Sequence, residues 1–236
     1  PVLNMKSDQD IKNMKCIAEE AFEMVKKYRG SHSGEHGDGI VRSEFHEKMF
    51  GKKIISSFEQ IKDSFDKKNL LNPHKIVRPF KSDDRSLMRY KSDYKAENIS
   101  THYDWSSWGQ FSDAVEMCNN NGACRKLDSG VMCPSYRVTK EEKDLVRGRA
   151  NTLRLALSNQ LPKDSFVSKG MYETMELCVS CKACQRECPM SVDMAKMKSE
   201  FLSHYYRKFS MSIKDRVISN MPKLIWLLKI SNPIIN

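Results

Sequence analysis

Four regularly spaced cysteines are the residues of this chain best suited to chemistry. They are Cys178, Cys181, Cys184 and Cys188, and Pro189 follows the last of them. Such C-x2-C-x2-C-x3-C-P spacing is typical of proteins with two iron–sulfur clusters, because three thiolates wrap around one cluster and the fourth points to the other. Zinc sites usually combine two separated pairs of ligands, and disulfide frameworks are typical of small secreted domains. The run therefore predicts iron–sulfur ligands.

A second cysteine set upstream supplies what a two-cluster site needs. Cys133 is followed by Pro134, as the last cysteine of the later run is followed by its own proline. In the crossed arrangement of two-cluster proteins, this last cysteine ligates the cluster of the other set. We therefore expect Cys133 to complete the cluster held by Cys178, Cys181 and Cys184.

The other cluster is expected to take Cys118, Cys124 and Cys188 as ligands. The usual spacing would place its middle cysteine at position 121, where this chain has Asn121. Iron in a sulfur cluster prefers soft thiolate ligands, so asparagine is a poor substitute. Three outcomes stay open: a three-iron cluster, a four-iron cluster with a non-cysteine ligand at one corner, or a rearranged loop.

Composition narrows the class of protein. The chain has 236 residues, a net charge of +10 and 39% hydrophobic residues, which suits one or two domains with a modest core. Its basic residues are dispersed and lack an RNA-binding aromatic pattern, so we expect no nucleic-acid partner. No apolar run approaches the roughly 20 residues needed to span a membrane. Seven metal-binding cysteines suit a reducing cytoplasm, and Cys16 remains as a free thiol.

Hydrophobic spacing predicts the elements that hold these residues. Helices are expected over residues 11–29 and 54–65, and the apolar stripe of the second should be core. A glycine-rich loop between them contains Glu35 and His36 side by side. Residues 81–111 are polar with scattered aromatics that should pack on a neighbouring element, and they predict an ordered linker.

Two further helices should flank the cysteine sets. Thr139 and Glu142 resemble a capping box that opens the first helix. Its arginines Arg147, Arg149 and Arg154 form either a solvated basic face or cations near an anionic cluster, where they would raise its potential. The second helix should include Met194, Met197, Phe201 and Tyr205 on one face. The chain opens on residues with strand character and begins without a methionine, so we expect a piece of a longer protein.

Two regions together resemble one family. GEHGDGIVRSEFHEKMFG with FDKKNLLNPHKIV is similar to the end of the substrate domain of FAD-linked oxidases of the vanillyl-alcohol-oxidase type. The cysteine sets around RGRANTLRLAL resemble the helical ferredoxin domain of long D-lactate and D-2-hydroxyglutarate dehydrogenases. The implied fold is mostly α: an α-helical ferredoxin-like domain preceded by an α+β C-terminal remnant of the oxidase domain. The implied parts are the remnant (residues 1–80), linker (81–111), two-cluster domain (112–209) and the start of a following region (210–236).

The resemblance also implies roles for three residues of the first region. Glu35 matches a glutamate that holds a divalent metal such as zinc near the substrate. His36 matches a catalytic histidine that contacts the 2-hydroxy acid, and Asn72 matches a cofactor-binding position near the flavin. The usual N-P-G-K sequence has His74 in place of glycine here. The family's histidine pair and FAD-binding domain would precede Pro1, so we expect the chain alone to be inactive.

The resulting functional hypothesis is an electron-transfer segment of a D-2-hydroxy acid dehydrogenase. Its cofactors would be two iron–sulfur clusters (4Fe-4S, the first either 4Fe-4S or 3Fe-4S), with FAD in the full-length protein. Its partners would be the N-terminal FAD domain, a small 2-hydroxy acid and an acceptor: a quinone, a cytochrome or an electron-transfer protein. It would be cytoplasmic or peripheral to a membrane. The alternatives are a separate iron–sulfur subunit of a glycolate or glycerol-3-phosphate oxidase complex and a nucleic-acid-binding protein with a metal knuckle.

Overall fold

The computed structural model describes residues 3–225 and divides into two compact units, Pro1–Tyr94 and Lys95–Asn236. The described residues are mostly helical, which confirms the predicted class. No strand occurs among them, so the strand component expected for residues 1–80 is not found there. A lone strand would leave its backbone groups without partners; instead, Ser7 accepts a hydrogen bond from the Asp10 amide and starts the first helix. The boundary between the units falls inside the predicted linker.

The first unit is built on three helices: α1 (Asp8–Lys27), α2 (His46–Phe50) and α3 (Lys52–Phe65). The predicted helices over residues 11–29 and 54–65 correspond to α1 and α3. A small core forms where Phe22 of α1 stacks on Phe45, with ring centroids 5.5 Å apart, and His32 packs edge-on against both rings. The glycine-rich loop leaves this core at His32.

The apolar stripe of α3 differs from the expectation that it is core. None of the residues of α3 is buried, and Phe65 is 88% exposed. Within the first unit, α3 makes its main helix contact with α2, and most side chains of the stripe stay exposed. The apolar pattern correctly predicted a helix. It could not predict whether another element packs against the apolar stripe and buries it.

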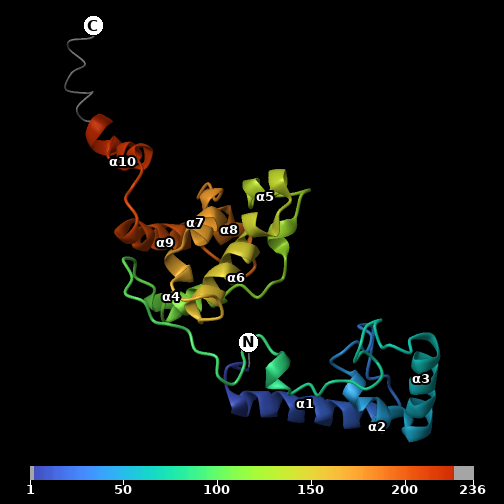
Figure 1. The fold of residues 1–236 in the computed structure, drawn as a ribbon. Helices are drawn as coiled ribbons and strands as arrows, with labels where there is room; N and C mark the ends of the chain where they lie inside the picture. Colours follow the sequence, from blue (N-terminus) through green and yellow to red (C-terminus); the bar gives the residue numbers. More distant parts are fainter. Residues whose placement is uncertain (1–2, 226–236) are drawn as a thin grey trace, which may run out of the picture. The chain divides into compact units, whose positions relative to one another are not determined.

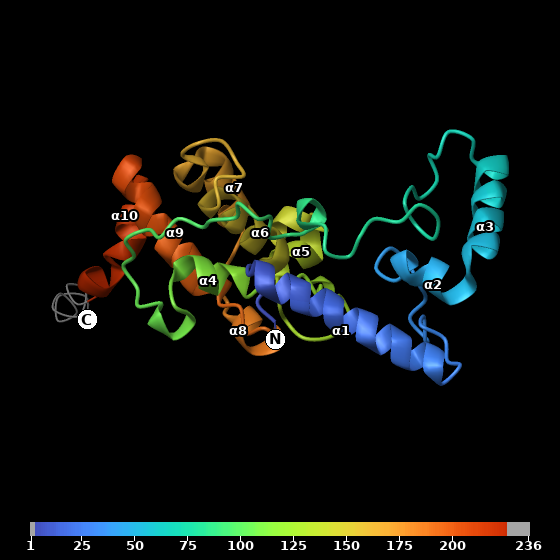
Figure 2. The same ribbon diagram turned by 90° about the horizontal axis from the view of Figure 1, so that it is seen from below.

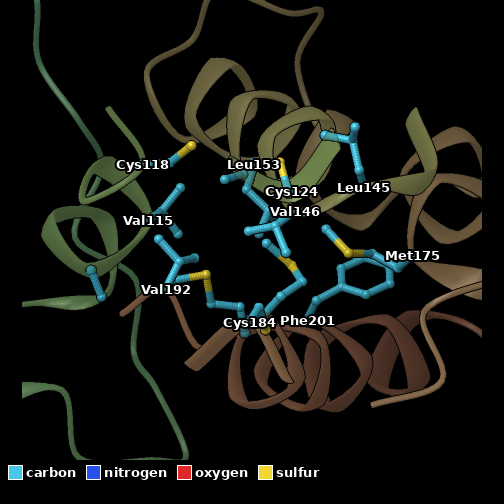
Figure 3. Close-up of a cluster of buried hydrophobic side chains, with 14 of the residues drawn as sticks. Val115, Cys118, Cys124, Leu145, Val146, Leu153, Met175, Cys184, Val192 and Phe201 are labelled. Atoms are coloured by element: carbon cyan, nitrogen blue, oxygen red, sulfur yellow. The ribbon is translucent and has the colours of Figure 1, made fainter. Parts of the chain in front are cut away.

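The second unit is centred on α6 (Val146–Leu157), which lies among α4 (Phe111–Glu116), α7 (Lys169–Glu176) and α9 (Met194–Lys208) (Figure 1 and Figure 2). The shorter α5 (Pro134–Thr139) begins directly after Cys133, α8 (Ala183–Glu187) contains Cys184, and α10 (Ile213–Ser219) follows. Figure 3 shows Cys118, Cys124 and Cys184 within the same buried cluster as Val115, Val146 and Val192. The hydrophobic core of this unit therefore contains the cysteines.

The predicted start of α6 was wrong. Thr139 is the last residue of α5, and α6 begins at Val146 after the 3-10 helix η5 (Glu142–Asp144). Its N-cap residue, Leu145, makes no side-chain capping hydrogen bond. Its first amides are directed instead at cysteine sulfur atoms, as described below, so the local capping signal was not used to begin this helix. The other predicted helix is confirmed as α9, with Asp193 as its N-cap.

A buried carboxylate fastens residues 102–105 to α9. Glu200 is fully buried and accepts hydrogen bonds from the His102 amide at 2.9 Å, the Tyr103 amide at 3.0 Å and Trp105 Nε1 at 3.0 Å. Trp105 also packs edge-on against Phe111, at 5.0 Å between ring centroids. Trp105, one of the aromatic residues of the predicted linker, therefore packs within the second unit.

Replacing Glu200 by glutamine is expected to destabilise the second unit by about 3 kcal/mol at pH 7, because charge-assisted hydrogen bonds are lost and the donors stay buried. Burial alone raises the pKa of Glu200, but its hydrogen bonds outweigh burial and the pKa lies below its usual value. The stabilisation should therefore be full above the unfolded pKa, about 4.3, and disappear as the pH falls through the folded pKa. Urea unfolding at several pH values measures this difference, with exposed Glu141→Gln as the control.

Candidate iron–sulfur sites

The structure brings together four cysteines that come from the two separate sets. Cys133, Cys178, Cys181 and Cys184 line one small cavity that is partly open to solvent. Cys133 precedes α5, and the other three lie between the end of α7 and the first turn of α8. The crossed grouping expected for one cluster is the grouping that lines this cavity.

The backbone around this cavity is tightly turned. Cys133, Ser180 and Lys182 have positive φ values of 55°, 54° and 59°. Non-glycine residues adopt this left-handed conformation uncommonly. Here it bends the chain sharply just before α5 and α8, so that closely spaced cysteines can face one space. Cys181 is exposed, whereas Cys133 and Cys184 are buried.

Helix N-termini supply hydrogen-bond donors to the buried sulfur atoms. The Val146 amide of α6 donates to Cys133 Sγ at 3.2 Å. Amides of Met194 and Ala195, the first residues of α9, stabilise the Cys184 thiolate in the same way. The first amides of a helix have no partner within it and carry the positive end of its dipole. The site is therefore arranged to hold anionic sulfur away from water.

Burial has the opposite effect on the bare thiols. It raises the pKa of Cys133 to about 12, and it also raises the pKa values of Cys124 and Cys184. Without a metal these groups are protonated at neutral pH. Because a metal binds the thiolate, cluster assembly must displace these protons. The buried cysteines are thus poor free nucleophiles and suit ligands whose charge is compensated by iron.

The cysteines expected to hold the other cluster also come from two segments of the chain. Cys118 and Cys124 are buried at the two ends of one loop, and Cys188 is half-buried just after α8. Asn121 is exposed, its Oδ1 accepts a hydrogen bond from the Ala123 amide at 2.8 Å, and its Nδ2 donates to Asn119. The Asn121 side chain is thus used to shape the loop. The role of Cys188 as a ligand stays a prediction.

The predicted substrate-side residues lie in the first unit. Glu35 and His36 are exposed in the glycine-rich loop, with Glu35 Oε1 and His36 Nε2 3.9 Å apart. Asn72 is exposed and has a φ of 47°. Among residues 3–225, no three His, Cys, Asp or Glu side chains converge closely enough to hold a single metal ion. The roles of Glu35, His36 and Asn72 therefore stay predictions.

Sequence reasoning missed three residues that shape these sites. Asp38 lies 3.1 Å from His46 Nε2 and anchors the glycine-rich loop to α2. Gly148 lies where α6 touches the backbone of Glu142. Asp144 is fully buried beside Arg149. For these three residues, the sequence offered one signal: Gly148 stands between two arginines, shortly after the upstream cysteine set.

Comparison with known proteins defines the class. Residues 1–76 match the family model of the C-terminal domain of FAD linked oxidases, and residues 114–192 match the 4Fe-4S dicluster domain. The chain therefore joins the C-terminal domain of an FAD-linked oxidase to a 4Fe-4S dicluster domain. No solved structure matches the chain. No helix in the described part is long and apolar enough to cross a membrane.

Three proteins to which the chain is similar are D-2-hydroxyglutarate dehydrogenases. The chain is 30% identical to a D-2-hydroxyglutarate dehydrogenase of Haemophilus influenzae, over 94% of this chain and 24% of the relative. It is 29% identical to the D-2-hydroxyglutarate dehydrogenase of Pseudomonas putida and 28% identical to that of Escherichia coli, each over 94% of this chain and 25% of the relative. The chain thus spans about a quarter of the length of the curated relatives that it matches.

Proposed function

We propose that this chain is the electron-transfer part of an FAD- and iron–sulfur-dependent D-2-hydroxy acid dehydrogenase, of the D-2-hydroxyglutarate or D-lactate class. The observation that carries the proposal is the single cavity lined by Cys133 together with Cys178, Cys181 and Cys184. Those cysteines belong to two distant sequence sets, as a two-cluster site requires. The matches to the oxidase and dicluster domains support the same function.

The residues present fit two clusters, and the redox chemistry would belong to the bound cofactors. When bound, clusters of this kind accept single electrons from a flavin and pass them to an acceptor. Cys133, Cys178, Cys181 and Cys184 would hold one cluster, and Cys118, Cys124 and Cys188 the other. The protein supplies thiolate ligands, amides directed at buried sulfur atoms, and a largely apolar surround. Exposed Cys181 leaves one side of the first cavity accessible to an acceptor such as a quinone, a cytochrome or an electron-transfer protein.

The substrate side of the proposal rests on the glycine-rich loop. Arg42 donates from Nη1 to the Gly37 carbonyl at 2.6 Å and to the Ser33 carbonyl at 3.2 Å, which holds the loop in shape. Glu35 would bind a divalent metal such as zinc, and His36 would take the hydroxyl proton of the substrate, as an imidazole can near pH 7. Asn72 would lie near the flavin. The complete enzyme would work in the cytoplasm, where thiols stay reduced.

The Glu35 role predicts a change in metal content. In the complete dehydrogenase, Glu35→Gln is expected to weaken binding of the substrate-side metal by about tenfold or more, because a neutral amide replaces a charged oxygen ligand. Metal analysis after dialysis against a weak chelator measures this. Cluster iron should not change, since Glu35 lies in the other unit. Unchanged zinc or other divalent metal in the variant would remove Glu35 from the ligand set.

Anaerobic reconstitution tests the electron-transfer function directly. Chain reconstituted with iron and sulfide is expected to contain enough of both for two clusters and to be reduced in two one-electron steps. Cys16→Ser is the matched control, because it removes the one cysteine outside both sets. A colourless protein that retains zinc would exclude the proposed function. The alternative of a separate iron–sulfur subunit is disfavoured because residues 1–76 match an FAD-linked oxidase domain.

Asn121 predicts a difference between the two clusters. Asn121 supplies no thiolate and its side chain is bonded within the loop, so the cluster that Cys118 and Cys124 would hold should lose iron in air. Electron paramagnetic resonance of air-oxidised protein should show a three-iron signal, which Asn121→Cys should abolish. Exposed Lys126→Cys, a thiol outside the expected ligand register, should leave the signal in place. Absence of the signal in the native chain would mean that another group protects this corner.

A further inference from the structure

The first turn of α6 contacts one cysteine of each expected cluster. The Val146 amide donates to Cys133 Sγ at 3.2 Å. The next amide, that of Arg147, stabilises the Cys124 thiolate by hydrogen bonding. Cys133 and Cys124 belong to different expected clusters, so consecutive peptide groups of one helix face different redox centres. The side chains that follow on α6 can therefore be compared, because each lies beside a different expected cluster.

The guanidinium of Arg149 belongs to the cavity of Cys133, Cys178, Cys181 and Cys184. It lines that cavity and is only 1% exposed. Arg149 Nε donates to the Thr174 carbonyl at 2.9 Å, and Nη1 donates to the Asp144 carbonyl at 2.6 Å. The Asp144 carboxylate lies 3.6 Å away and offsets part of the charge. The network fixes a cation beside the cavity, where little water can screen it.

The guanidinium of Arg147 belongs to the loop of Cys118 and Cys124. Its Nη1 lies 3.2 Å from the point where a side chain on Gly122 would begin, so it covers that loop. Two hydrogen bonds to Glu142, of 2.6 Å and 2.9 Å, hold it in place. These bonds fix the guanidinium beside the loop of Cys118 and Cys124. Arg147 thus lies beside cysteines of the other expected cluster.

Gly148 lets the two arginines diverge. Residues two apart on a helix do not face each other, so Arg147 and Arg149 point to different sides of α6. Between them, the backbone of Glu142 approaches so closely that a Cβ on Gly148 would lie 2.0 Å from the Glu142 carbonyl oxygen. The Arg-Gly-Arg sequence therefore packs closely at its centre and places one cation on each side.

We infer that Arg147 and Arg149 set the reduction potentials of the two clusters separately. Arg149 acts on the cluster of Cys133, Cys178, Cys181 and Cys184, and Arg147 acts on the cluster of Cys118 and Cys124. The inference rests on the proposed function. Reduction adds one negative charge to a cluster, and the potential depends on net charge, hydrogen bonds to sulfur and exposure. A fixed cation beside one cluster therefore raises the potential of that cluster more than that of the other.

Potentiometric titration of the reconstituted chain, followed by electron paramagnetic resonance, tests this inference. Arg149→Gln should make reduction of its own cluster about tenfold less favourable, a shift of about 59 mV to lower potential for a one-electron couple. The other cluster should not shift. Arg147→Gln should give the reverse pattern, with a smaller shift because Glu142 already pairs with Arg147. Signals are assigned in a Cys181→Ser background, which leaves one cluster.

The controls separate this inference from the function on which it rests. Lys143→Gln removes the same charge at an exposed position before α6 and should shift neither potential, and Arg147→Lys should restore most of the Arg147→Gln shift. Failure of the native chain to assemble two clusters would refute the proposed function itself. Suppose instead that two normal clusters assemble. If their reduction potentials shift together in the arginine variants, or shift no more than with Lys143→Gln, the inference is wrong and the proposed function is unaffected. If Arg149→Gln fails to fold, the Arg147→Gln variant still tests the inference, because Arg147 is partly exposed. Its two reduction potentials either shift selectively or do not.

Discussion

Replacing Cys133 by serine should remove the cluster held by Cys178, Cys181 and Cys184, although these lie in a later segment of the chain. The reason is geometric, since all four cysteines line one cavity. Serine oxygen is a harder ligand than the thiolate that iron–sulfur clusters prefer. Iron and sulfide bound after anaerobic reconstitution should fall to about half, and one of the two reducible signals should disappear.

Double substitutions make the crossed assignment testable. Cys133→Ser combined with Cys181→Ser should lose no more iron than either change alone, because both act on one cluster. Cys133→Ser combined with Cys118→Ser should lose nearly all iron, while Cys16→Ser should lose none. If the first pair were additive and the second were not, Cys133 would belong to its own sequence set and the crossed arrangement would be wrong.

Gly148→Ala is expected to destabilise the second unit by about 3 kcal/mol. Alanine is the better helix former by up to about 1 kcal/mol, so propensity alone predicts the opposite sign. The added Cβ would lie 2.0 Å from the Glu142 carbonyl oxygen and 2.8 Å from its carbon, and both are backbone atoms. The start of α6 must then move, and the amides facing Cys133 and Cys124 move with it. Cluster content should therefore fall together with stability.

Gly170→Ala in α7 is the matched control. A Cβ there would meet only Ser168 Oγ, at 3.9 Å, which is ordinary contact. The variant should be as stable as the native chain or slightly more stable. Chemical unfolding of both variants, with and without reconstituted clusters, measures the difference. Equal stability of the two variants would show that α6 can move away from Glu142 at little cost.

Much of the site could be predicted because its signals are local in the chain. Thiolate spacing depends on the few residues between Cys178 and Cys188, and the grouping with Cys133 follows from the known crossing of such runs. The helices α1, α3 and α9 were found because their periodicity is a property of contiguous residues. Local signals were misleading where a distant group competed for the same atoms. Thr139 was expected to cap α6, yet the first amides of that helix are directed at cysteine sulfur atoms.

The sequence by itself determined which side chains can bind iron and roughly where the helices run. It left the arginines of α6 open between a solvated face and a place beside a cluster. Only the tertiary structure decided that Arg149 is buried beside the cavity of Cys133, while Arg147 covers the loop of Cys124. The physical reason is that exposure, charge proximity and close backbone contact depend on segments far apart in the chain. Helix periodicity describes one element alone, so it cannot say what another element places against each face.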